Sequence, residues 1–395
     1  MKKKLISLIS MVAVVAMLVF SLTACGGSSD TKPAGSGSGS APVPSTGSIK
    51  IGVLVADVSG EEAQGFRSYY ENYIAPNYGV QFLYTEQLSD AASEKSAIEK
   101  FASQGCSAIL SFSSSDRALQ IETCEENEIY YAVASGMLDD AQYEQYKGYE
   151  YFVGQVGPSM ETEYQAGYEM GKHFKESGAK TIAMYGAFIP NPMHVYRAAG
   201  VLAGIGATYG GADEMNAVVG QIFGDQGIDL SKVKANGVEL VSYFQGYGDT
   251  TADELNAAIQ ANPDAFISVG MATTFFAQQL STAKIPFSDI DSFTSANNTS
   301  MKDGSLVYLA GKYSSSIGPV FALVLDAING NVIRNAEGNA VSISQGFRVA
   351  TTPEEFDSLV SNDSGANPIF SKAVLDTVIS ATATYDDFVQ LVESN

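Results

Sequence analysis

Histidine is scarce in this chain, and the residue patterns of common catalytic sites are missing. His173 and His194 are the only two histidines. The sequence has no Gly-x-Ser-x-Gly elbow, no His-Glu-x-x-His motif and no cluster of Cys or His suited to a metal. Because acid–base catalysis relies so often on imidazole, these absences argue against an enzyme. They predict no catalytic residue, no metal site and no cofactor.

Basic residues are also few. The chain has 22 Lys and Arg against 44 Asp and Glu, a net charge of −22, and loss of Lys2, Lys3 and Lys4 would leave 19 basic residues and a net charge of −25. A surface this acidic repels phosphate backbones and anionic head groups. Nucleic acid is therefore excluded as an expected partner.

Only one run of the sequence is long and apolar, Leu5 to Ala24, and it follows the three N-terminal lysines. A basic start, an apolar stretch and small residues before a cleavage point are typical of an export signal. The alternative is a membrane-spanning helix, since the run is about long enough to cross a bilayer. The uncharged flank Gly26-Gly27-Ser28-Ser29 favours a signal peptide over residues 1–24.

The end of this run, Leu22-Thr23-Ala24-Cys25, resembles the lipobox of bacterial lipoproteins. The resemblance implies that the Cys25 thiol takes a diacylglycerol and becomes the first mature residue. Residues 26–48 are nearly all Gly, Ser, Ala, Pro and Thr, which predicts a flexible tether over 25–48. The protein is expected to be exported and lipid-anchored, on the outer face of the bacterial cytoplasmic membrane or the periplasmic side of an envelope membrane.

Cysteine is limited to Cys25 and two further residues, Cys106 and Cys124. Cys106 precedes a predicted strand over 108–112, and Cys124 lies near the end of the predicted helix over 116–126. A helix that crosses back over a parallel sheet returns its C-terminus towards the start of the strand, so the two thiols could meet. An exported compartment permits a disulfide, and two buried thiols packing as small apolar groups are the alternative.

About 350 residues remain after the tether, enough for two domains. From residue 49, short apolar runs alternate with amphipathic stretches. The first series has strands predicted over 49–55, 80–84, 108–112, 129–134 and 151–153, with helices over 91–103 and 116–126. The second has strands over 181–185, 238–243, 265–269, 290–294 and 305–310, with helices over 161–174, 194–204, 255–261, from 274, and over 317–328. This order predicts an α/β fold of two doubly wound parallel-sheet lobes.

Two segments do not follow the alternation. Residues 207–237 form a long, Gly-rich insertion, and the tail after Thr351 is predicted to be helical over 353–360, 371–379 and 385–392. The sequence leaves open whether they decorate the second lobe or contact a partner.

The chain from Ile49 to about Val349 resembles the type I periplasmic binding proteins, the ribose-binding-like class that serves ABC importers. The resemblance is based on the order of elements and three local patterns: Arg197-Ala198-Ala199-Gly200, Asn262-Pro263-Asp264-Ala265-Phe266-Ile267, and the helix from Ser316-Ile317-Gly318 to Ala327-Ile328-Asn329-Gly330. It implies two lobes joined by a three-crossing hinge that closes on a ligand.

Mapped onto this sequence, the resemblance places the crossings near 154–160, 311–314 and 336–342. The first lobe would then comprise 49–155 and 312–338. The second would comprise 156–311 and 339–395, including a C-terminal helical extension. The implied partners are a small-molecule ligand and ABC permease subunits, and a monomer is expected.

Open parallel sheets bind ligands beyond the carboxyl ends of their strands. This rule selects polar and apolar positions that follow the predicted strands of both lobes. The predicted ligand-binding residues are Asp57, Ser113, Ser114, Asp116, Met137, His194, Tyr243, Gln245, Met271, Asn297 and Lys312.

Several of these residues have a structural alternative. Asp57 and Asp116 could serve as helix caps without touching a ligand, and His194 could be a solvated surface residue. Phe66 is predicted to lie in the core and Arg197 to be a structural ion partner.

The resemblance also implies a difference in ligand. Where ribose-type members carry Asp-Arg after the fourth strand, this sequence has Gly136-Met137, and a later cleft Asp is replaced by Gly270, followed by Met271. Fewer fixed charges and more thioether groups favour a ligand with an apolar or aromatic face. The expected ligand is a nucleoside, purine, sugar or other ring compound. A receptor that hands its liganded form to a membrane signalling protein is the alternative function.

Overall fold

The computed structural model describes residues 48–395 except 57, 114, 190 and 247, and these residues belong to one compact unit. The predictions for the signal peptide, Cys25, the tether up to residue 47, Asp57 and Ser114 lie outside the described residues. Within the described part of the chain, no helix is both long enough and apolar enough to cross a membrane.

The first sheet has six parallel strands in the order β13-β5-β4-β3-β1-β2. Helices cover both faces, so its strands are nearly continuous apolar runs, as in Ile-Lys-Ile-Gly-Val-Leu of β1. The strands are β1 (Ile49–Leu54), β2 (Val80–Tyr84), β3 (Ala108–Ser111), β4 (Tyr130–Val133), β5 (Phe152–Gly157) and β13 (Val341–Ser344).

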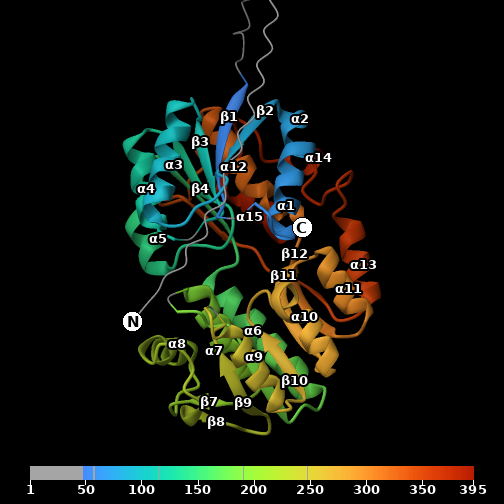
Figure 1. The fold of residues 1–395 in the computed structure, drawn as a ribbon. Helices are drawn as coiled ribbons and strands as arrows, with labels where there is room; N and C mark the ends of the chain where they lie inside the picture. The colour runs from blue at the N-terminus through green and yellow to red at the C-terminus, as the bar shows by residue number, and fades with distance from the viewer. Residues whose placement is uncertain (1–47, 57, 114, 190, 247) are drawn as a thin grey trace, which may run out of the picture. The chain divides into compact units, whose positions relative to one another are not determined.

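Helices α3 and α4 cover one face of this sheet and α12 the other (Figure 1). The α12 helix is buried on all sides because it lies between the sheet and the chain's C-terminal segment. The helices of this first lobe are α1 (Glu61–Ser68), which continues through η1 (Tyr69–Ile74) into α2 (Ala75–Tyr78), then α3 (Ala91–Ser103), α4 (Arg117–Glu126), α5 (Asp140–Tyr146), η3 (Ser314–Ile317), α12 (Gly318–Ile328), α14 (Lys372–Leu375) and α15 (Tyr385–Glu393).

The second sheet has the order β14-β12-β11-β10-β6-β9 and is parallel except for the antiparallel edge strand β14. Its strands are β6 (Thr181–Tyr185), β9 (Glu239–Phe244), β10 (Ala265–Ser268), β11 (Phe287–Ser292), β12 (Leu306–Lys312) and β14 (Arg348–Ala350). The predicted α/β class with two parallel-dominated sheets is thus confirmed.

The second lobe also has helices on both faces of its sheet. Helices α6 (Met160–Glu176) and α7 (Pro192–Gly204) cover one face, and α9 (Thr251–Gln260), α10 (Ala272–Ala283), α11 (Ser295–Lys302) and α13 (Pro353–Asn362) belong to the other. The insertion at 207–237 folds into β7 (Thr208–Tyr209), α8 (Met215–Gly224), η2 (Leu230–Lys232) and β8 (Val233–Lys234). It adds Tyr209 and Ile222 to the α6–α7 side of the core, so it decorates this lobe.

Over the described residues from 48 to 395, the chain passes between the lobes in four places. The first two passages follow β5 and β12, close to the predicted positions. The third was predicted near 336–342 but follows β13, because residues 341–344 pair with β5 as the edge strand of the first sheet. A fourth passage, absent from the prediction, follows α13.

The assignment of all of 339–395 to the second lobe is therefore wrong. Only β14 and α13 belong there; α13 buries Phe356 in the second-lobe core. After Asn362 the chain returns, and Phe370, Leu375 and Phe388 are buried in the core of the first lobe. The apolar side chains of α14 and α15 complete that core over α12, which otherwise would leave a face open to water.

Two further predictions are corrected or decided by the structure. The strand predicted at 290–294 begins earlier, at Phe287, since buried polar residues such as Asp289 and Asp291 interrupt its apolar pattern. Residues 295–302, left without a prediction, form α11. Cys106 and Cys124 are both free buried thiols, so the packing alternative holds.

Candidate functional site

A buried carboxylate anchors the loop after β3 through hydrogen bonds. Glu94 of α3 is fully buried and accepts hydrogen bonds from the Ser113 hydroxyl, from Gln120 Nε2 at 2.8 Å and from the Asp116 backbone N–H at 3.2 Å. These contacts fix the start of α4, where the Asp116 carboxylate caps the helix by accepting from Leu119 N at 3.0 Å.

Arg117 ties this loop to the one that follows β4. Its Nη1 donates to the Met137 carbonyl at 2.7 Å and its Nη2 to the Ser135 carbonyl at 2.5 Å. Burial lowers the pKa of the guanidinium, which nevertheless stays charged because an arginine pKa starts far above neutrality. Gly136 and Met137 are thereby held at the carboxyl ends of the first-lobe strands.

The facing wall in the second lobe is built on a buried ion pair. Arg197 Nε donates to Glu163 Oε2 at 2.6 Å and its Nη1 to the Val269 carbonyl at 2.8 Å, which confirms the predicted structural role of Arg197. His194 lies one turn earlier in α7. Burial and the nearby Arg197 charge lower its pKa to about 3, so it is neutral.

Between these walls lies a cavity of about 580 Å³. Its lining combines apolar Phe, Met and Pro side chains with carboxylate, amide and hydroxyl groups. Its lining residues are Phe112, Ser115, Asp116, Arg117, Ser135, Gly136, Met137, Asp139 and Gln142 from the first lobe, Pro158 from the first passage, and Met160, Glu163, Phe188, Asn191, Pro192, Met193 and Lys312 from the second lobe.

This cavity can hold a small molecule that combines apolar surface with several hydrogen-bonding groups. Its volume lies within the ordinary range for ligand sites, about 300–1,000 Å³. The described residues hold no group of three or more His, Cys, Asp or Glu that could bind a metal ion. The lining residues themselves offer hydrogen-bonding groups and apolar contacts.

Among the predicted ligand residues that the structure describes, three lie together on this cavity: Asp116, Met137 and Lys312. Ser113 is beside it, but the hydroxyl is turned onto Glu94 and the residue is buried. The structure also confirms that Phe66 lies in the core of the first lobe.

The other predicted residues that the structure describes lie elsewhere. Tyr243 and Gln245 line a separate hollow of about 470 Å³ beside α9. Asn297 is fully buried and donates to the Ser292 carbonyl at 2.8 Å. His194 is buried against Arg197, and Met271 is 41% exposed at the start of α10.

Several cavity residues were missed by the sequence reasoning. Arg117 follows a capping Asp directly, which marks the first turn of a helix facing the cleft, and this signal was available. Met160, Glu163 and Met193 lie on helices that begin at the cleft, and only the packing of α6 against α7 brings them to its wall.

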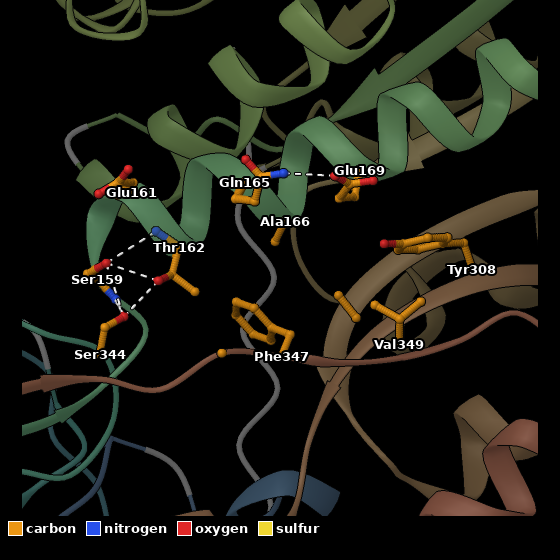
Figure 2. A pocket seen from close by; sticks show the side chains of 12 residues that line it. Ser159, Glu161, Thr162, Gln165, Ala166, Glu169, Tyr308, Ser344, Phe347 and Val349 are labelled. Carbon is orange, nitrogen blue, oxygen red and sulfur yellow. Dashed lines mark hydrogen bonds between the residues drawn. The ribbon is translucent and has the colours of Figure 1, made fainter. Parts of the chain in front are cut away.

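Another hollow, also of about 470 Å³ but distinct from the one beside α9, lies between α6 and the strands β12 and β14 (Figure 2). Ala166, Tyr308, Phe347 and Val349 give it an apolar side. At one end the hydroxyls of Ser159, Thr162 and Ser344 bond to one another, with Thr162 Oγ1 and Ser344 Oγ 2.7 Å apart. These bonds tie the first passage between the lobes to the third.

Comparison with known proteins finds solved structures that resemble this chain in fold. No family model matches the chain, and no curated protein matches it. A solute-binding protein of an ABC transporter from Bacillus halodurans, with bound myo-inositol, matches with a TM-score of 0.59 and 14% identity, over 81% of this chain and 100% of that one. The arabinose-binding component from Shewanella sp. ANA-3 matches with a TM-score of 0.56 and 14% identity, over 83% and 98%.

A third solved structure, from Actinobacillus succinogenes with bound D-allose, matches with a TM-score of 0.58 and 14% identity, over 78% of this chain and 99% of that one. The chain has the type I periplasmic binding protein fold. In this fold the cavity described above occupies the seam between the lobes, beyond the carboxyl ends of both sheets, as the rule for parallel sheets requires.

Proposed function

We propose that this protein is an extracytoplasmic solute-binding lipoprotein that captures a small molecule between its lobes and delivers it to an ABC importer. The observation that carries the proposal is the cavity lined by both lobes and by the passage after β5. A molecule bound there touches both lobes and so favours the closed form. The protein acts by binding and not by catalysis.

We further propose that the ligand is a hydroxylated ring compound, a sugar, cyclic polyol or nucleoside. Among the lining residues, Asp116, Asp139, Gln142 and Asn191 can bond to hydroxyl or amide groups. Phe112, Phe188 and the Met side chains can pack on the face of a ring. The structural neighbours named above contain myo-inositol, L-arabinofuranose and D-allose, which is consistent with this class.

A thermal-shift screen of the purified full chain against sugars, polyols, nucleosides and purines tests this proposal. A compound present at a hundred times its dissociation constant should stabilise the protein by about 2.7 kcal/mol. Substituting Gln142→Ala on the cavity wall should weaken a hit, and Gln145→Ala on the exposed side of the same helix is the matched control. If all four classes leave the melting temperature unchanged, the proposed ligand class is wrong.

The lipid anchor is part of the same proposal and has its own test. Growth of expressing bacteria with a radiolabelled fatty acid should label the chain, and Cys25→Ser should abolish the label and release the protein from the membrane fraction. Cys106→Ser is the control, since that thiol is buried and burial raises its pKa to about 11. Equal labelling of the parent and Cys25→Ser would contradict the anchor.

A further inference from the structure

The first turn of α1 reaches across the seam and binds the second lobe. Glu61 accepts from the Ser295 backbone N–H and hydroxyl, both at 2.7 Å. Glu62 accepts from the Ser292 hydroxyl at 2.8 Å and pairs with the Lys312 ammonium at 3.0 Å. These five residues, Glu61, Glu62, Ser292, Ser295 and Lys312, are called the interlobe latch below.

The surroundings of Glu62 favour its charged form. Burial opposes ionisation of Glu62, but the Lys312 ammonium, the hydrogen bonds from Ser292 and Lys312, and the more distant Arg197 charge outweigh it and lower its pKa. Lys312 is itself largely buried and lines the ligand cavity. Its position on the cavity wall therefore depends on a carboxylate supplied by the opposite lobe.

An acidic side chain of the second lobe comes directly before Ser292, whose hydroxyl donates to Glu62. Asp291 on β11 is buried, accepts from the Ser292 N–H at 2.8 Å and receives Asn297 Nδ2 from α11 at 3.2 Å. Two charged groups influence the Asp291 carboxylate: Asp289 of the same strand and Glu62 of α1. The ammonium of Lys312, on β12, pairs with Glu62. Burial, followed by the charges of Asp289 and Glu62, raises the pKa of Asp291 to about 7.

We propose that Glu62 is a positioning residue of the cleft, which holds the Lys312 ammonium across the seam and, together with Glu61, latches the second lobe onto the first in the absence of ligand. The proposal rests on the proposed function, because a latch matters only if the lobes open and close around a ligand. Glu61 and Glu62, which are not among the residues lining the cavity, then share in setting closure, so that it depends on α1 as well as on the bound molecule.

The latch also predicts that closure depends on pH, and the sign follows from the repulsion between the Glu62 and Asp291 charges. Opening removes Glu62 from Asp291, so the pKa of Asp291 is lower in the open form than in the closed form. The closed form therefore binds more protons near neutrality, and acidification through pH 7 favours closure. Protonation of Glu62 itself, whose pKa lies below its usual 4.5, breaks the latch at still lower pH.

Small-angle X-ray scattering of the full chain without added ligand tests the latch, comparing about pH 8 with about pH 6 on either side of the Asp291 pKa. The parent should contract as the pH falls. Glu62→Gln should have a larger radius of gyration at both pH values. The charge swap of Glu62→Lys with Lys312→Glu should restore the parent radius, and Asp291→Asn should be as compact at pH 8 as the parent is at pH 6.

Glu71→Gln is the matched control, because Glu71 lies on the same helical segment and pairs with Arg67 of its own lobe, at 2.9 Å. Equal scattering by Glu62→Gln and Glu71→Gln at both pH values would overturn the latch. If Glu62→Gln failed to fold, Ser295→Ala, which removes only the hydroxyl bound to Glu61, carries the same comparison. The measurement needs no ligand, so failure of the latch and failure of the ligand screen are separate outcomes.

Discussion

The imidazole of His194 is buried in the wall of the second lobe, where solvent cannot stabilise a positive charge. Arg197 lies three residues later in the same helix and adds a repulsive charge. Both effects disfavour the imidazolium, in the order burial first and Arg197 second, and together they lower the pKa to about 3. A residue that was expected either in the cleft or at the surface is instead a neutral part of the core.

This burial predicts a loss of stability in acid. The folded-state pKa lies below the unfolded value of 6.5, so the stability that neutral His194 provides is present above pH 6.5 and is lost as the pH falls towards 3. His194→Gln should therefore lose less unfolding free energy than the parent between pH 7.5 and pH 4.5 in urea titrations. His173→Gln is the control, because His173 is only half-buried and should contribute less. Identical acid-induced losses in His194→Gln and the parent would contradict this account.

At the scale of elements, the contact that fixes the second-lobe wall is the packing of α6 on α7. The two helices come so close that a Cβ on Gly167 would lie 1.9 Å from the Arg197 carbonyl oxygen, and a Cβ on Gly200 would lie 2.0 Å from the Tyr164 carbonyl oxygen. This approach sets the spacing between Glu163, which lines the cavity between the lobes, and its partner Arg197.

Gly167→Ala should force the helices apart and destabilise the protein by about 3 kcal/mol, the upper range for overpacking of a core. Ligand affinity should fall with it, since Glu163 lines the cavity. Gly220→Ala in α8 is the control: its Cβ would meet nothing within 4 Å, and replacing a helical Gly should instead add about 0.5–1 kcal/mol. Chemical denaturation measures both, and a neutral Gly167→Ala would show that the close approach is dispensable.

At the scale of the whole molecule, the described chain passes four times from one lobe to the other, and its last segment packs in the core of the first lobe. Phe388 of α15 is fully buried in the core that surrounds α12, although it is separated from the rest of that lobe by β14 and α13. The first lobe is therefore built from three separate stretches of sequence, and its stability depends on residues near the end of the chain.

Phe388→Ala should destabilise the protein by about 3–5 kcal/mol, the usual range for removing a large aromatic side chain from a core. Hydrogen exchange should show the loss of protection mainly in β1, β5 and β13, with β9 and β10 less affected. Val360→Ala on α13, where the side chain is 38% exposed, is the control and should change stability by less than about 0.5 kcal/mol. Equal loss of protection in both lobes would mean that they unfold as one unit.

Much of the fold could be predicted because local pattern and global structure agree. Strands such as 181–185 and helices such as 91–103 were predicted with their observed bounds. The prediction failed at β11, where buried Asp289 and Asp291 depend on partners from α10 and α11 that no local pattern reveals. It failed also in the tail, since helical periodicity identifies an apolar face but not the lobe on which that face packs.

The candidate site could be predicted only in part, for a related reason. The rule for parallel sheets places residues at the correct edge, and Asp116, Met137 and Lys312 do line the cavity. It does not say which way a side chain turns: Asn297 turns onto Asp291, and Tyr243 and Gln245 line a different hollow. Those choices depend on hydrogen-bond partners that are far away in sequence.

The sequence by itself determined the alternation of strands and helices, the excess of negative charge and the absence of a recognisable catalytic motif, because each is a property of residue type and spacing. Only the tertiary structure decided which residues share the cavity, that the C-terminal segment returns to the first lobe, and that Glu62 meets Lys312 across the seam. The physical reason is that desolvation, ion pairing and close packing are interactions between surfaces, and the chain brings those surfaces together only when it folds.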